Sequence, residues 1–549
     1  MRRQPNQSRG FTLTELLVAI GLMAVLMLAV NMIFSSAGNA IGVGQAMSTG
    51  MRDMRAVEKV IRKDLDGAAI SDGPFFMIRS SVEASFVNHK DRLSDKYTEN
   101  GIFNAAAANA RLLEILSADP KQLGAESPQP VARYGLRTFR TDILGFFSRS
   151  STTKYRRQTG NIGNFAAPMS SEEAYVWYGH VRLPDNLVPL NYFSPGSSSG
   201  WQTSATNPNN FYASQWMLGR QTMLLRAPDA SNNIYDDAGV SQDFIDRAAG
   251  APVTDLAPLC MSADSKTGAY AISQTRFDLA GTTIADYRTL VNNAFAAGIL
   301  DWWDQRFSYR FLVNPFPSRP LDDTKAAQTV PIFVNNCSQF VVEYTGDFIT
   351  QNPATGKGTS AVPDGIPDWM VSGFAGTWNN TDPYKVGVVV CDAAFNRIYR
   401  CIVANSGQAV TNTTYWTEVT ADQAGAIPNK AARVPLWYGL PRDVNGDGRI
   451  SVYSDVVPLR DYMPAGPLQK QPFERDCPVQ QNDYGQKTYV TPINTGPANG
   501  LAPYEQYICA WGPDTPLSPL PQMLRILVKV EDPTGRVDLP WQEMIFKLP

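Results

Sequence analysis

The residue whose position most needs a chemical explanation is Glu15. It stands directly before an apolar run from Leu16 to Phe34 that carries no charge. Such a run has the length, ~20 residues, that crosses a bilayer as a helix. A carboxylate at the membrane boundary is costly and usually has a cationic partner. We therefore expect charge pairing to be the chemistry of this end of the chain.

The residues around Glu15 indicate what that partner is. Residues 9–17 read RGFTLTELL, and this string resembles the amino-terminal signal of type IV prepilins and pseudopilins. The resemblance implies that a prepilin peptidase cuts after Gly10, on the cytoplasmic side, and that the new terminal residue, Phe11, is N-methylated. Glu15 then corresponds to the acid at the fifth position of the mature chain.

Cleavage would leave a free ammonium on Phe11 at the depth of Glu15, where it can neutralise the carboxylate. In the family this pairing joins neighbouring subunits of a filament, so the resemblance implies that Phe11 and Glu15 guide assembly. Two other interpretations stay open. A secretory signal peptide has a shorter apolar stretch followed by a small-residue cleavage site, and a plain single-span anchor leaves Glu15 without a role.

A second set of candidate ligands lies in residues 443–455, DVNGDGRISVYSD. Its first nine positions resemble an EF-hand-type calcium loop, with side-chain oxygens at positions one, three and five and glycine at six. Position twelve, which should supply a bidentate carboxylate, holds Ser454, and Asp455 follows one residue later. A tight Asn-Gly or Asp-Gly turn is the alternative. The candidate Ca²⁺ ligands are Asp443, Asn445, Asp447, the carbonyl of Arg449, Ser451 and Asp455.

Few other residues offer catalytic chemistry. His89 and His180 are the only histidines, so zinc sites and histidine-based catalysis have little raw material. Residues 196–200, GSSSG, match the G-x-S-x-G pattern. They stand in a Ser/Gly-rich loop, however, whereas a nucleophile elbow joins a strand to a helix. We expect no enzymatic activity.

The cysteines favour a structural role. All six lie after residue 259, on the far side of the apolar run from the amino terminus. An even number in an oxidising compartment predicts up to three disulfides, with free buried thiols as the alternative. The six are Cys260, Cys337, Cys391, Cys401, Cys477 and Cys509.

A long helix must position the amino-terminal residues. Beyond the apolar run, apolar residues recur at spacings of three and four from Met47 to Leu65, which predicts one buried face of a helix that packs on a sheet. Four glycines between residues 38 and 50 each cost ~1 kcal/mol against alanine, so we expect a bend or local melting there. Basic residues precede the apolar run and none follow it closely, which predicts a cytoplasmic amino terminus.

The rest of the chain favours a head rich in strands. Residues 67–330 mix short β-rich runs with loops, and residues 105–116 and 287–303 have helical patterns. From residue 331 the strand signal strengthens, at 340–344, 386–390, 397–403 and 524–530, and residues 520–549 read as a closing hairpin. We divide the chain into a leader at 1–10, a helix at 11–66 that spans the membrane at about 12–34, an elaborated region at 67–330 and a β-rich region at 331–549.

Composition excludes several classes of protein. The 549 residues are 44% hydrophobic and 11% aromatic, which is too apolar for a disordered chain. The net charge of −3 argues against nucleic-acid binding. A polytopic membrane protein would need further apolar runs.

The sequence thus predicts an α+β protein with a pilin-like fold, in which a long amino-terminal helix packs on an antiparallel β-sheet head with large insertions. Residues 62–65, 340–344 and 520–528 resemble J-type minor pseudopilins of type II secretion. The resemblance implies a single-pass protein of the bacterial inner membrane with a periplasmic head, part of the tip of a pseudopilus. Its implied partners are prepilin peptidase, other minor and major pseudopilins and secreted substrates. The alternative is a minor pilin or adhesin of a type IV pilus.

Overall fold

The structure is a computed structural model. It describes residues 12–69, 76–86, 136–149, 155–157, 169–181, 217–225, 234–235, 241–242, 279–280, 283–285, 288–289, 332–422, 430–440, 442, 444, 453, 455–459, 474–476, 506–512, 518–530 and 539–549. The predicted helix at 105–116 and most of the one at 287–303 lie outside these ranges. The described residues form a long amino-terminal helix and a mostly antiparallel β head, as the predicted α+β class requires.

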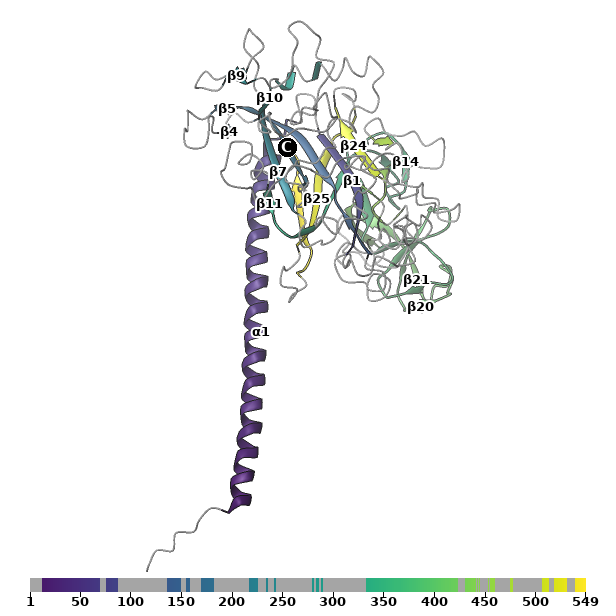
Figure 1. Ribbon diagram of the computed structural model, residues 1–549. Coiled ribbons are helices and arrows are strands. Elements are labelled where there is room, and N and C mark those ends of the chain that lie inside the picture. Colours follow the sequence, from purple (N-terminus) through teal and green to yellow (C-terminus); the bar gives the residue numbers. More distant parts are fainter. Residues whose placement is uncertain are drawn as a thin grey trace, which may run out of the picture.

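Helix α1 runs from Leu13 to Asp66 without interruption and projects from the head as one rod (Figure 1). The expected bend or melting at the glycines is therefore wrong for this structure. Adding a residue to an existing helix costs far less than nucleating one, and the glycines are flanked by long helical segments. One of them has a packing role, because a Cβ at Gly50 would lie 3.2 Å from Leu539 Cδ1 of the closing hairpin.

The predicted apolar face of α1 packs in the head over its last four turns. Met54, Val57, Ile61 and Leu65 are buried in the main core. Two members of the predicted face, Met47 and Met51, stay 36% and 46% exposed because the head ends beside them. The spacing of three and four residues therefore predicted the correct face of the helix. How far the head extends along the helix decides how much of that face is buried.

The described strands of the head form one large sheet with the order β10-β7-β6-β3-β1-β24-β23, in which β11 also pairs with β7 and β2 with β1. All neighbours are antiparallel except β10 and β7. Strands from both halves of the chain meet in it, since β24 pairs with β1. The bounds are β1 Phe76–Phe86, β2 Leu136–Arg140, β3 Ile143–Arg149, β6 Glu173–His180, β7 Leu218–Leu225, β10 Leu279–Ala280, β11 Ile332–Val334, β23 Glu474–Asp476 and β24 Gln506–Trp511.

A second sheet consists of β12 (Cys337–Gly346), β25 (Pro521–Val530) and β26 (Gln542–Lys547), in that order. Strands β25 and β26 are antiparallel over six residue pairs, which confirms the predicted closing hairpin. Both sheets and the end of α1 contribute to one apolar core. Short ribbons lie apart from the sheets: β4 Tyr155–Arg157 with β5 Met169–Ser171, and β8 Ile234–Tyr235 with β9 Ser241–Gln242.

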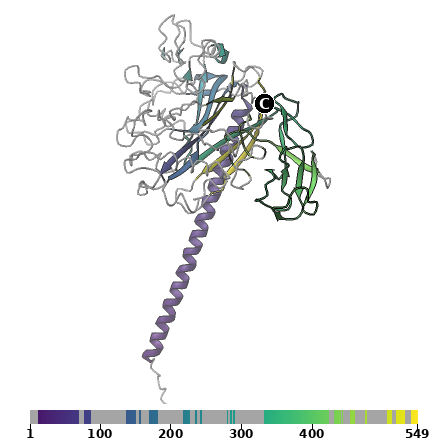
Figure 2. The same ribbon diagram turned by 90° about the vertical axis from the view of Figure 1, so that its right-hand side faces the viewer.

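Residues 347–435 form a further unit, which we call the inserted domain. It lies beside the head (Figure 2) and has apolar clusters of its own. Its main sheet has the order β15-β22-β21-β19-β18-β16, with the ribbons β13-β14 and β17-β20 beside it. The bounds are β13 Thr350–Gln351, β14 Gly358–Ser360, β15 Trp369–Val371, β16 Phe374–Thr377, β17 Pro383–Tyr384, β18 Val389–Cys391, β19 Ile398–Cys401, β20 Asn405–Ser406, β21 Trp416–Asp422 and β22 Lys430–Pro435.

The disulfide prediction is wrong for the four cysteines that the structure describes. Cys337, Cys391, Cys401 and Cys509 are all buried, and none of these four forms a disulfide. Cys391 and Cys401 lie on neighbouring strands but out of register, because Cys391 is opposite Ile398. Each of the four occupies a position in a packed sheet, where a thiol behaves as a small apolar side chain. Cys260 and Cys477 lie outside the described residues.

Candidate functional site

The amino-terminal candidate residues lie at the free end of α1. Gly10 and Phe11 precede the described residues, and Glu15 lies in the first turn of the helix. The helix begins close to the predicted cleavage point, since the Leu16 N–H donates to the Thr12 carbonyl at 3.1 Å. Processing after Gly10 would therefore place the new amine within one turn of Glu15 along the chain.

The lower part of α1 is an unpartnered apolar surface. Leucine, valine, isoleucine, methionine and phenylalanine side chains from Leu16 to Phe34 are largely exposed in the isolated chain. Among the described residues, α1 is the one helix that is long and apolar enough to cross a membrane, and its apolar part is not covered by the head. Exposing so large an apolar surface to water is unfavourable. We therefore expect lipid or other apolar helices to cover it.

A buried ion pair fastens the other end of α1 to the head. Asp64 accepts hydrogen bonds from Arg220 Nε at 2.7 Å and Nη2 at 2.9 Å. The Tyr178 hydroxyl donates to the same carboxylate at 2.5 Å. Tyr178 and Arg220 are direct neighbours on β6 and β7. Three donors thus fix the last turn of the helix on two strands of the large sheet.

The electrostatics of this anchor follow from its burial. Burial raises the pKa of Tyr178 well above its ordinary value, and the nearby Asp64 charge raises it further, so the phenol stays a neutral donor. Burial alone would lower the pKa of Arg220, but the Asp64 carboxylate outweighs it and raises that pKa. The Arg220 guanidinium therefore stays charged, and the Tyr178 hydroxyl stays a neutral donor, at every ordinary pH.

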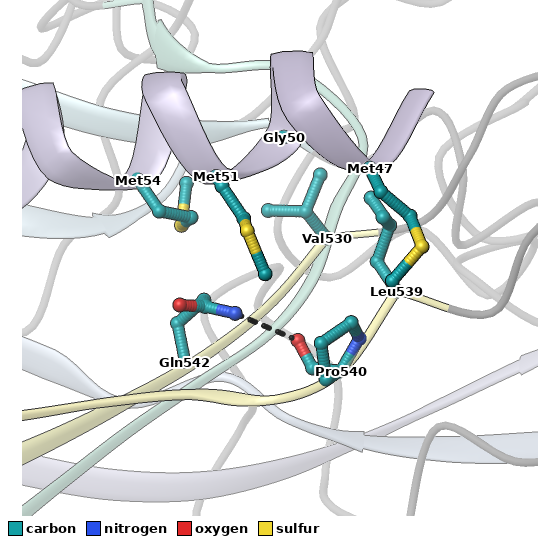
Figure 3. Close-up of a pocket in the computed structure, with 8 residues that line it drawn as sticks. All are labelled: Met47, Gly50, Met51, Met54, Val530, Leu539, Pro540 and Gln542. Atoms are coloured by element: carbon teal, nitrogen blue, oxygen red, sulfur yellow. Dashed lines mark hydrogen bonds between the residues drawn. The ribbon is translucent and has the colours of Figure 1, made fainter. Parts of the chain in front are cut away.

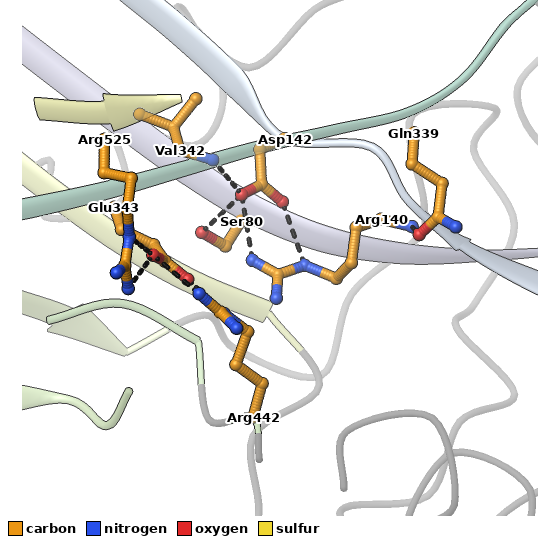
Figure 4. A network of polar contacts seen from close by, with 8 residues as sticks. All are labelled: Ser80, Arg140, Asp142, Gln339, Val342, Glu343, Arg442 and Arg525. Carbon is orange, nitrogen blue, oxygen red and sulfur yellow. Dashed lines mark hydrogen bonds and ion pairs between the residues drawn. The ribbon is translucent and has the colours of Figure 1, made fainter. Parts of the chain in front are cut away.

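A second polar network joins the two sheets (Figure 4). Asp142 accepts hydrogen bonds from Ser80 on β1 at 3.2 Å, from Arg140 Nη2 at 2.9 Å and from the Val342 N–H on β12 at 2.8 Å. Arg140 and Asp142 are both almost wholly buried. Because each donor comes from a different strand, this carboxylate fixes β12 against the large sheet.

Glu343 extends the network between two arginines. Its carboxylate accepts from Arg442 and from Arg525 Nε, the latter at 2.5 Å, and it is fully buried. Burial alone would raise its pKa, but the charges of Arg442 and Arg525 outweigh that effect and lower it to about 2. All three groups are held by one another, which indicates a structural network rather than a catalytic one.

A shallow apolar notch lies where α1 leaves the head (Figure 3). The Gln542 side chain donates to the Pro540 carbonyl across its floor at 3.3 Å. None of the described residues that line it is charged, so this part of the lining offers no acid or base. Its lining residues are Met47, Gly50, Met51, Met54, Val530, Leu539, Pro540 and Gln542.

The structure describes one of the six candidate calcium ligands, Asp455. Asp455 is buried, and its Oδ1 accepts a hydrogen bond from the Val444 N–H at 3.4 Å. The Arg442 N–H donates to the Val456 carbonyl at 3.0 Å, which closes the loop at its base. The loop therefore returns Asp455 to the segment where the ligand series starts. Asp443, Asn445, Asp447, Arg449 and Ser451 lie outside the described residues, as do residues 196–200.

The sequence pattern did not reveal the Asp64–Arg220 anchor. One signal was available. Asp64 follows Ile61 by three residues, so it lies on the predicted apolar face, where a carboxylate needs a partner when it is buried. Its partner lies 156 positions away in the chain, and no local pattern marks it.

The comparisons with known proteins concern the amino terminus. A family model described as a prokaryotic N-terminal methylation motif matches residues 5–31. No curated protein and no solved structure matches the chain. The matched segment contains Gly10, Phe11 and Glu15 and most of the apolar run. The chain therefore carries a type IV pilin-like signal, which implies processing by a prepilin peptidase and assembly with other pilins.

Proposed function

We propose that this protein is a minor pseudopilin of a type II secretion-like system. Prepilin peptidase would cut it after Gly10 and methylate Phe11. The mature subunit would stay in the bacterial inner membrane with its head in the periplasm until it joins the tip of a pseudopilus. There it would contact other minor and major pseudopilins and secreted proteins.

The observation that carries this proposal is the methylation motif at residues 5–31 at the start of a helix that continues into the head. An unbroken helix from Leu13 to Asp66, fixed by Asp64 to two strands, couples the apolar segment mechanically to the head. Such an arrangement suits a subunit whose helix inserts into a bundle while its head makes specific contacts. The J-type resemblance carries no weight here, because nothing beyond residues 62–65, 340–344 and 520–528 supports it.

A minor pilin or adhesin of a type IV pilus is the second candidate. The inserted domain at 347–435 favours it, because a separate β unit with its own core is a natural carrier for a binding surface. The two candidates predict different neighbours. A pseudopilin should associate with other pseudopilins of a secretion system, whereas a pilus subunit should associate with the major pilin of a retractable fibre.

Purification from native membranes tests the proposal. The full chain, carrying a carboxy-terminal tag, is cross-linked in cells, purified and analysed for associated subunits by mass spectrometry. Several pseudopilins in the purified complex would support the secretion role. Recovery of a major pilus subunit in their place would support the adhesin, and recovery of neither would contradict both.

We also propose that residues 443–455 bind Ca²⁺, supported by the return of Asp455 to the loop start. A chelator should then lower the melting temperature of the full chain, and added Ca²⁺ should restore it. The Asp443→Asn/Asp447→Asn double variant should lack this response while Asp382→Asn, in the inserted domain, keeps it. A wild-type melting temperature that does not respond to chelator would refute the site.

A further inference from the structure

The inserted domain is attached where the chain enters it after β12 and leaves it after β22. Just outside that point, Tyr344 and Tyr438 exchange backbone hydrogen bonds of 3.1 and 2.8 Å. Phe348 and Ile349, just inside it, still pack in the main core, and beyond them the chain forms two further apolar clusters. The entering and leaving segments are therefore neighbours, and the short stretch that holds both is the junction between head and domain.

Asp368 connects the segments of this junction through its backbone. Its N–H donates to the carbonyl of Gly346, the last residue of β12, at 2.7 Å. Its own carbonyl accepts from the N–H of Leu436, the first residue after β22, at 3.0 Å. One residue of the inserted domain thus bridges the entry and the exit of the chain.

The side chain of Asp368 makes the same connection a second time. Its carboxyl accepts from the backbone N–H groups of Phe348 at 3.1 Å and Ile349 at 3.3 Å, which belong to the entering segment. The Tyr438 hydroxyl, from the leaving segment, is 2.9 Å away. Asp368 is completely buried.

The surroundings of this carboxyl disfavour its charged form. Burial raises the pKa of Asp368 to about 8, although the hydrogen bonds from Tyr438, Phe348 and Ile349 oppose the shift. Among the described residues, the titratable groups that face it are the Tyr438 hydroxyl from the leaving segment and the Asp347 carboxylate from the entering one. The Asp347 charge raises the pKa of Asp368 further. Glu343, in contrast, is buried between two arginines and stays charged.

We propose that the Asp368 carboxyl is a proton-dependent joint, which holds the inserted domain to the head while it is protonated and loosens that attachment when it ionises. In the neutral form Oδ1 carries the proton, and Oδ2 continues to accept the hydrogen bond from the Tyr438 hydroxyl. When the proton leaves to solvent, the junction holds a buried charge beside Asp347. Opening the junction hydrates that charge, so ionisation favours the open state. This inference does not rest on the proposed role in secretion.

The direction of the pH effect on junction opening, and the pH range in which it acts, follow from the different proton affinities of the closed and open states. The carboxyl has a pKa of about 8 in the closed junction and an ordinary value of about 4 when the junction is open. The closed state therefore binds the proton more tightly, and its advantage is complete below about pH 4. Between about pH 5 and pH 8, opening should become about tenfold more favourable for each pH unit, and above pH 8 it should level off.

Hydrogen exchange of the full chain in detergent micelles tests the joint. The readout is the protection factor of the Phe348 and Ile349 amides, corrected for intrinsic exchange. It is measured from pH 5 to pH 9, under conditions in which the junction closes faster than the open amides exchange. We expect the wild-type factor to fall about tenfold per pH unit up to pH 8. Asp368→Asn, which keeps the shape but cannot ionise, should remove the slope. Asp392→Asn, in a surface turn of the same domain, should retain it.

A second variant keeps the test decisive if Asp368→Asn does not fold. Tyr438→Phe removes a donor that lowers the pKa of Asp368, so protection should continue to fall beyond pH 8. A wild-type protection factor that is independent of pH would overturn the proposal. So would an unchanged slope in a folded Asp368→Asn protein, or an unmoved plateau in Tyr438→Phe.

Discussion

The carboxylate of Asp64, in the last turn of α1, and the guanidinium of Arg220, on β7, form a buried ion pair through two hydrogen bonds of 2.7 and 2.9 Å. This pair lies at the end of the helix opposite to the methylation motif. It makes the apolar segment and the head one mechanical unit. The proposed role, in which the helix inserts into a bundle of subunits, requires such a connection.

Removal of Arg220 should destabilise the protein, because Asp64 would remain as a buried charge. We expect Arg220→Met to lower the free energy of unfolding by about 2–4 kcal/mol. This is less than the loss on breaking a fully buried ion pair, because the Arg220 side chain is 27% exposed. Urea unfolding of the full chain in detergent, followed by tryptophan fluorescence, measures this. Arg397→Met, which removes an exposed pair with Glu418, is the matched control and should cost less than about 1 kcal/mol. Equal losses for both variants would show that the anchor is unimportant.

The Glu343 network should make the protein sensitive to acid. The folded-state pKa of Glu343 is about 2, below its unfolded value of about 4.3. Its contribution is therefore complete above about pH 4.3 and is lost as the pH falls towards 2, a loss of roughly 3 kcal/mol. Unfolding free energies measured at pH 6, 4 and 2.5 test this in the wild type and in Glu343→Gln. Glu343→Gln should be less stable than the wild type at pH 6, and its unfolding free energy should fall less on acidification. If the unfolding free energies of the two proteins fall in parallel with pH, Glu343 is not the source of the acid sensitivity.

The packing of the upper helix should be unequal along its apolar face. Ile61 is wholly buried and Met51 is nearly half exposed. We expect Ile61→Ala to cost about 2–5 kcal/mol through lost burial and a cavity, and Met51→Ala less than about 1 kcal/mol. Thermal unfolding of the full chain would rank them. Similar costs at both positions would mean that the head extends further down the helix than the structure shows.

Glu15 should matter for assembly and not for processing. We expect Glu15→Ala to lose its ten-residue leader normally but to be depleted from complexes with other subunits, because its carboxylate no longer attracts the Phe11 ammonium. The measurement compares cross-linked complexes of the wild type, Glu15→Ala and Glu15→Asp. If Glu15→Ala is recovered in these complexes as efficiently as the wild type, the pairing of Glu15 with the Phe11 ammonium is contradicted.

The sequence was most informative where structure depends on neighbours along the chain. The spacing of Met54, Val57, Ile61 and Leu65 predicted the buried helix face, and the closing hairpin followed from two β-rich runs around a turn. Contacts between distant residues were not predictable in this way. Nothing local pairs Asp64 with Arg220, or places Asp368 at the junction of a separate domain.

Two expectations failed for identifiable physical reasons. The glycines of α1 do not break it, because helix propagation is cooperative and one of them, Gly50, permits close packing against Leu539. The disulfide prediction rested on the number of cysteines. Cys391 and Cys401 show its weakness, since strand register places them opposite other residues and leaves them as free buried thiols.

Intact-mass analysis of the amino terminus of the protein from its native membrane tests the central claim most directly. We expect a chain that begins at N-methylated Phe11, with residues 1–10 removed, and a Gly10→Ala variant that remains at full length. A natural protein that still begins at Met1, or that is cut after the apolar run, would contradict it.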